Sequence, residues 1–266
     1  MYSIYDFPEV YDVVLQHSPE VIAAEVASIE GLLAKHGVMR GHVLELACGA
    51  CPHGILLSQH GFAVTGVDRS PAMLATAARR AAEAGALLRL VQGNIVDFAL
   101  GTEPVDVALF MFETFPVITA YDDLVSHFRA VRRHMRPGGL YIIDLDPRKH
   151  GVGVSTEEWG RKTLSLPNGS VEVWNEDFPG DWVEGISHMI LHCRILLDGA
   201  TYETADEWRM RVYSPWDLRV LVQTLEGWTL DGFCSWRDLS PDIANEEHYW
   251  MVLEARKIRL SRRSVL

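Results

Sequence analysis

Short apolar runs alternate with amphipathic stretches along the first part of the chain, as expected for a sheet whose strands are connected by helices. Five runs have the near-continuous apolar character of strands buried on both faces: residues 43–47, 63–67, 87–91, 105–110 and 140–145. Helices are predicted between them at residues 52–60, 71–84 and 121–135. Pro52 and Pro71 suit the first turn of a helix, where a missing N–H costs nothing. The alternation predicts an α/β fold with a doubly wound sheet.

A different pattern occupies residues 147–213, which we expect to form an antiparallel β insertion. Four strand-like runs follow one another there, at residues 162–166, 171–177, 186–197 and 201–212. Asn168-Gly169 and Asp198-Gly199 lie between runs and are typical of hairpin turns. A helix at 215–225 and strands at 228–236 and 248–256 are predicted after the insertion. The expected units are an N-terminal arm and helix (1–38), a core (39–146), the insertion (147–213) and a C-terminal completion of the core (214–266).

Small and acidic residues follow the first two predicted strands. Gly49 lies in the turn after the first strand, and Asp68 ends the second. In a doubly wound sheet, ligands bind at the carboxyl ends of the strands, and an acid after the second strand can accept both hydroxyls of an adenosine ribose. The pattern therefore predicts a cofactor that contains a nucleoside. A dinucleotide would require three closely spaced glycines, whereas only Gly49 and Gly54 are present, which disfavours a nicotinamide-dependent oxidoreductase.

Five segments, in order, resemble the class I S-adenosylmethionine (SAM) methyltransferases. They are Glu45-x-Ala47-x-Gly49-x-Cys51, VTGVDRSPAML, VQGNIVDF, VDVALFMFETF and RPGGLYIIDLD, and they cover about residues 40–146. The resemblance implies a seven-stranded Rossmann-like sheet with the last strand antiparallel, SAM as the cofactor and methyl transfer as the activity. Tyr11-Asp12 of the N-terminal arm and the β insertion are similar to those of small-molecule N-methyltransferases, such as the amino-sugar dimethyltransferases of natural-product pathways.

The resemblance also implies which residues surround the cofactor. They are Tyr11, Glu45, Ala47, Cys48, Gly49, Asp68, Arg69, Met73, Asn94, Ile95, Met111 and Phe112. Two positions depart from the family pattern, because Cys51 replaces a customary glycine and Asn94 a frequent acid. These departures leave a second hypothesis open, in which the protein binds SAM but is non-catalytic or catalyses a reaction other than methyl transfer.

The acceptor side of the site is less defined by sequence, because methyl transfer from a sulfonium depends mainly on positioning. Nitrogen and oxygen of a small molecule both remain possible acceptors. The candidates for a base or an orienting group are Glu113, His150 and His188, with His192 on the same predicted strand face as His188. No metal is expected, because Asp144 and Asp146 lack the downstream Asp-Asn partner of metal-dependent catechol methyltransferases. In the similar N-methyltransferases the insertion caps the acceptor site and can form a dimer interface, which makes a homodimer a further expectation.

Composition and charge further restrict the classes of substrate and partner. The net charge of −12, without a basic stripe, argues against nucleic acid as a substrate. The chain has no long apolar run and no basic start followed by an apolar stretch, so neither a membrane span nor a secretory signal is predicted, and we expect a cytoplasmic protein. Cys48-x-x-Cys51 lacks the second ligand pair of a structural zinc site, and we interpret it as small residues that fill a cofactor turn.

Overall fold

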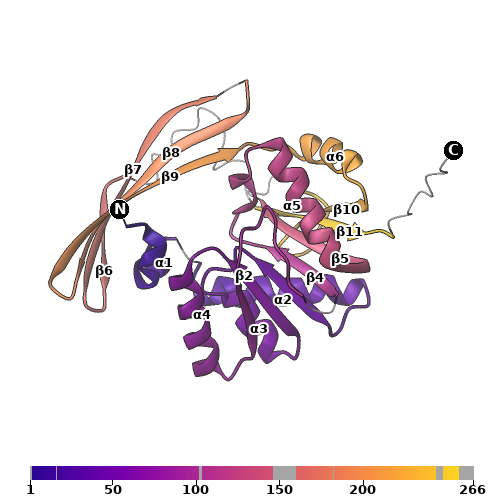
Figure 1. Ribbon diagram of the computed structural model, residues 1–266, viewed down its shortest axis with the longest axis horizontal. Coiled ribbons are helices and arrows are strands. Elements are labelled where there is room, and N and C mark those ends of the chain that lie inside the picture. Colours follow the sequence, from indigo (N-terminus) through magenta and orange to yellow (C-terminus); the bar gives the residue numbers. More distant parts are fainter. Residues whose placement is uncertain are drawn as a thin grey trace.

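The computed structural model describes residues 2–15, 17–101, 104–145, 160–181, 183–243 and 248–257. They form two sheets, and the smaller one projects from the side of the larger (Figure 1). The seven strands of the larger sheet have the order β10-β11-β5-β4-β1-β2-β3, and β11 is antiparallel to both of its neighbours. This topology confirms the expected α/β fold and its antiparallel last strand.

The strands of the larger sheet are β1 (His42–Leu46), β2 (Ala63–Asp68), β3 (Leu88–Gln92), β4 (Val105–Phe110), β5 (Met135–Leu145), β10 (Trp228–Ser235) and β11 (Tyr249–Ala255). β5 begins five residues before the expected position, because Met135 already pairs with Val105 ahead of a register shift. β1 to β5 are parallel, so their carboxyl ends lie along one edge of the sheet. That edge is where a doubly wound sheet binds ligands.

Helices cover both faces of the larger sheet: α2 (Pro19–Lys35), α3 (Pro52–Gln59) and α4 (Pro71–Ala84) on one, and α5 (Tyr121–His134) and α6 (Pro215–Thr224) on the other. Ile29 and Leu57 pack with Val43 on the first face, whereas Phe128 and Leu218 belong to the core of the second. No helix in the described ranges is both long and apolar enough to cross a membrane.

The four-stranded antiparallel sheet consists of β6 (Lys162–Leu166), β7 (Gly169–Asp181), β8 (Ile186–Leu197) and β9 (Ala200–Arg211). The N-terminal arm covers its apolar face, where Ile4 and Val10 share a core with Val173 and Leu191. The N-terminal arm contains a short 3-10 helix, η1 (Ile4–Asp6), and a helix α1 (Pro8–Val14). A capping box at the start of η1 and Pro8 in the first turn of α1 favour these helices. In Figure 1, α1 lies between the smaller sheet and α4.

Candidate functional site

Asp68 connects the turn after β1 to the end of β2 through hydrogen bonds. Its Oδ2 accepts the N–H of Gly49 and its Oδ1 the N–H of Ser70, both at 2.8 Å. Gly49 has a φ of 53°, a left-handed conformation that glycine adopts without strain. A Cβ at Gly49 would lie 3.2 Å from Cε of Met73, so Met73 packs against this turn. The backbone donors fix the Asp68 carboxylate, and each oxygen keeps a lone pair for a ligand hydroxyl.

Glu45 supports the same turn from inside the core. Its Oε2 accepts the Gly54 N–H at 2.7 Å and the Cys51 thiol at 3.1 Å, and the residue is only 1% exposed. Ala47 and Cys51 have φ values of 49° and 57°, a conformation that costs a residue with a Cβ about 1–2 kcal/mol. The Cys51 side chain is directed to Glu45, so its size does not obstruct the crevice. Cys48, predicted to contact the cofactor, is buried.

The N-terminal arm lies beside Asp68. Ser70 Oγ donates a hydrogen bond to the Tyr5 carbonyl (3.2 Å), and the rings of Tyr5 and Tyr11 are 5.6 Å apart. The Arg69 guanidinium lies 5.8 Å from the centre of the Tyr5 ring. Burial raises the pKa of Tyr5 to about 12, and burial together with Tyr5 and Asp68 raises the pKa of Tyr11. The structure thus groups Tyr11 and Arg69 with Asp68.

Asn94 and Ile95 follow β3 in a loop held by a histidine that was not singled out from the sequence. Asn94 is exposed, and its Oδ1 accepts the Val96 N–H at 2.9 Å, so a contact with an adenine amino group would use the second lone pair of this oxygen. The Ile95 carbonyl accepts the N–H of His127 Nδ1 at 2.7 Å, and His127 Nε2 lies 2.6 Å from the Tyr141 hydroxyl. Burial lowers the pKa of His127 to about 4, which keeps the ring neutral at pH 7.

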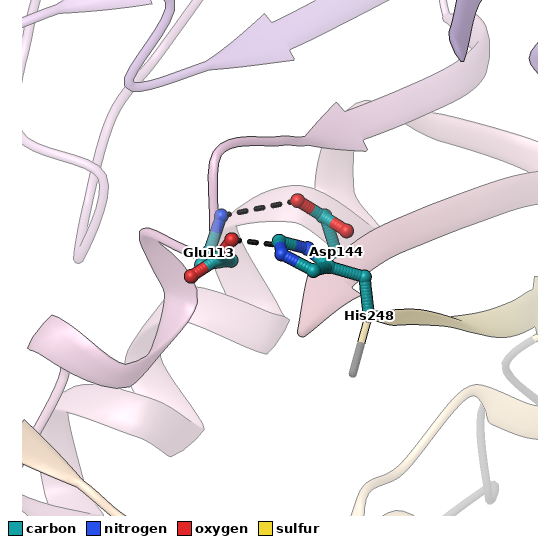
Figure 2. Close-up of side chains that lie close together, drawn as sticks. All are labelled: Glu113, Asp144 and His248. Carbon is teal, nitrogen blue, oxygen red and sulfur yellow. Dashed lines mark hydrogen bonds and ion pairs between the residues drawn. The ribbon is translucent and has the colours of Figure 1, made fainter. Parts of the chain in front are cut away.

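The loop after β4 brings Glu113 to two residues from distant parts of the chain, Asp144 at the end of β5 and His248 immediately before β11 (Figure 2). Glu113 Oε1 lies 3.0 Å from His248 Nδ1, and the Glu113 N–H donates to Asp144 Oδ2 at 3.2 Å. Phe112 and Glu113 have φ values of 58° and 53°, and such strain in consecutive residues is typical of functional loops. Met111, before them, is buried.

Asp144 lies in an unfavourable place for a charge. It is 1% exposed, and burial together with the Glu113 carboxylate raises its pKa to about 7, against a smaller opposite effect of His248. The carboxylates of Glu113 and Asp144 therefore lie close together at the strand ends, with the His248 imidazole beside them. A group with this environment at the ligand-binding edge is a functional-site candidate.

A buried row of ionisable groups continues from this cluster behind the cofactor turn. His53 Nε2 lies 2.8 Å from Glu25 Oε2, and His53 Nδ1 lies 3.6 Å from Glu45 Oε1. Glu25 Oε1 is also 3.1 Å from His17 Nδ1, and Phe112 lies against the rings of both histidines. Burial alone would lower the pKa of His53, but the hydrogen bond to Glu25 and the nearby Glu45 carboxylate raise it to about 9. Burial alone would raise the pKa of Glu25, but its bonds to His17 and His53 lower it to about 2.

The other catalytic candidates lie elsewhere. The His188 ring stacks on Phe178, and its Nε2 is 2.9 Å from Glu207 Oε1, so its partners are on β7 and β9. His192 stacks on Trp174 in the same sheet. His150 lies outside the described residues.

Sequence reasoning named Glu113 but gave no role to Asp144 and did not single out His248. A signal for their proximity was present. An antiparallel strand inserted beside β5 begins at the edge where β5 ends, which places the residue before β11 next to Asp144. The sequence also indicated that Glu25 is buried, because this residue falls on the apolar stripe of α2 together with Ile22, Val26 and Ile29.

Comparison with known proteins agrees with this architecture. Residues 43–139 match the family model described as a methyltransferase domain. A SAM-dependent methyltransferase from Clostridium acetobutylicum has the same fold, with a TM-score of 0.75, 17% identity and coverage of 96% of this chain and 99% of that one. The fold is therefore that of the class I SAM-dependent methyltransferases.

Among the similar proteins are several named for methyl transfer to amino sugars. The chain is 31% identical over 144 residues to a dTDP-4-amino-2,3,4,6-tetradeoxy-D-glucose N,N-dimethyltransferase of Saccharopolyspora spinosa. The aligned part covers 53% of this chain and 56% of the relative. The structure of the sugar N-methyltransferase KedS8 from Streptoalloteichus has a TM-score of 0.69, 19% identity and coverage of 89% and 88% of the two chains. The chain spans about half the length of the first curated relatives it matches.

Proposed function

We propose that this protein transfers a methyl group from SAM to an amine nitrogen of a small polar molecule of the amino-sugar type. The observation that carries the proposal is the position of Asp68, whose two oxygens are fixed by backbone donors at the strand ends beside the turn and under the arm. A carboxylate held in this way can accept both ribose hydroxyls of SAM. Gly49 and Met73 meet at this turn, and Tyr11 packs against Tyr5 beside it.

The loop after β4 is the proposed acceptor side. Methyl transfer breaks the bond from sulfur to the methyl carbon as the bond to nitrogen forms, and the positive charge moves from sulfur to nitrogen. A neutral amine already has the lone pair it needs, and the product ammonium releases its proton to solvent, so no strong base is required. Glu113 would orient the acceptor, and nitrogen is preferred to oxygen because the similar relatives with a named acceptor atom are N-methyltransferases.

The first test is calorimetric titration with S-adenosylhomocysteine, the demethylated product of SAM. We expect micromolar binding, because backbone donors already hold the Asp68 carboxylate in place. Methyl transfer would then be assayed with dTDP-4-amino-2,3,4,6-tetradeoxy-D-glucose and with its analogue that carries a hydroxyl in place of the amine. Methylation of the amine alone is expected. An absence of binding at millimolar S-adenosylhomocysteine would contradict the cofactor assignment, and methylation of the hydroxyl analogue would contradict the preference for nitrogen.

A further inference from the structure

Glu113, Asp144 and His248 offer one ligand atom each, and these atoms all lie within 4.8 Å of one another (Figure 2). We propose that the three side chains form a binding site for a divalent transition-metal ion such as Mn²⁺ or Zn²⁺. The proposal departs from the metal-free site expected from the missing Asp-Asn pattern. It deepens the proposed function, because the loop after β4 is the proposed acceptor side.

The separations of the ligand atoms suit a common ion. Two ligands at about 2.0–2.2 Å from an ion are separated by about 3.4–3.6 Å in a tetrahedral Zn²⁺ shell, and in an octahedral shell by about 3 Å when adjacent and about 4.4 Å when opposite. Glu113 Oε1 and His248 Nδ1, 3.0 Å apart, match an adjacent pair. The widest separation among the three ligand atoms is at most 4.8 Å. A small rotation of a side chain would shorten it by the few tenths of an ångström needed for two opposite ligands. An ion would replace the direct contact between Glu113 and His248 with two coordination bonds.

Asp144 supplies an independent reason to expect a cation. Its side chain is almost completely buried, and Oδ2 accepts only the Glu113 N–H, at 3.2 Å, among the described residues. Within that part of the chain, Oδ1 accepts no hydrogen bond, so it is available to a cation. In Figure 2 this carboxyl group lies beside Glu113 and the His248 ring. A positive ion between these groups would satisfy the free oxygen and compensate the two facing carboxylates.

The ligand types restrict the identity of the ion. Carboxylates alone suit Mg²⁺ and Ca²⁺, whereas an imidazole nitrogen in the set favours first-row transition ions. Three protein ligands leave positions open for water or for an oxygen of the acceptor, as in catalytic rather than structural sites. An amine bound to the ion would lose the lone pair it needs for attack. The ion is therefore assigned an anchoring role toward acceptor oxygens, with the nitrogen left free.

The test is calorimetric titration of the chelator-treated full chain with Mn²⁺ and, separately, Zn²⁺. We expect one ion per chain and at least a tenfold loss of affinity in both Glu113→Gln and Asp144→Asn, because each removes an anionic ligand but keeps the shape of the side chain. Glu30→Gln is the matched control, since Glu30 forms a similar pair with His60 (2.9 Å) on the surface. Its affinity for the ions should equal that of the native protein.

Binding that is absent at millimolar Mn²⁺ and Zn²⁺, or equally strong in both variants, would overturn the metal site. Far-UV circular dichroism of the same samples checks that each variant retains its fold. S-adenosylhomocysteine titration separates the two proposals, because an absence of binding to the native protein would contradict the cofactor assignment and leave the metal titration interpretable.

Discussion

Asp68→Ala should lose S-adenosylhomocysteine binding by a factor of about 100 or more. Hydrogen bonds to a charged group contribute about 1.5–3 kcal/mol each, so the loss of both ribose contacts corresponds to at least about 3 kcal/mol. Each 1.4 kcal/mol changes affinity about tenfold. The alanine also leaves the N–H groups of Gly49 and Ser70 without their acceptor, which loosens the turn. Calorimetric titration of the variant measures the effect directly.

Two further variants separate recognition of the ribose from general damage. Asp68→Asn keeps an acceptor oxygen but lacks the charge, and its affinity should lie between those of the alanine variant and the native protein. Asp231→Ala removes an acid that pairs with His36 (3.3 Å), away from the crevice, and should bind as the native protein does. If the affinity of Asp68→Ala were unchanged, the ribose would have to bind elsewhere, and the proposed cofactor site would be wrong.

The larger sheet was predictable because its signals are local. Each strand is a short apolar run that ends at small or polar residues, and the connecting helices α3 and α4 each have a proline in the first turn. Asp68 and Gly49 followed from the same reasoning, since the rule that ligands bind at the carboxyl ends of parallel strands needs no side-chain detail. The register of β5 was not predictable, because its early start depends on pairing with Val105 across a shift.

The acidic and histidine groups of the site were harder to predict, because long-range packing brings them together. Glu113 was identified from its loop alone, but its partners depend on how β11 is inserted beside β5. Glu25 and His53 resemble ordinary helix residues in the sequence, and only the packing of α2 on α3 reveals that they form a buried pair. Positions where a charge falls on an apolar helix stripe are therefore useful indicators of such networks.

His53→Gln should lower the free energy of unfolding by about 3–5 kcal/mol at pH 6. His53 is fully buried between Glu25 and Glu45, and removal of one partner from a buried ionic group leaves the other charges uncompensated. The expected decrease in melting temperature is about 10 °C for a chain of this size. Urea unfolding of both proteins, followed by circular dichroism, measures the difference.

The effect should depend on pH in a definite direction. The pKa of His53 is raised from 6.5 to about 9 in the folded protein by Glu25 and Glu45, so its contribution is fully present below pH 6.5. The contribution decreases between pH 6.5 and about 9 and is lost above that, because the folded protein then no longer binds the extra proton. The shift corresponds to about 3 kcal/mol at about 1.4 kcal/mol per pKa unit. The native protein and His53→Gln should therefore differ much less at pH 9.5 than at pH 6.

His60→Gln is the matched control for this experiment. His60 also pairs with a glutamate, Glu30, at 2.9 Å, but its side chain is 47% exposed, and exposed pairs of this kind contribute little. We expect its unfolding free energy to stay within about 0.5 kcal/mol of the native value at both pH values. A loss in His53→Gln that is the same at pH 6 and pH 9.5 would mean that His53 stabilises the site by packing against Phe112 and not by its charge, and that the two glutamates behind the cofactor turn are compensated by other groups.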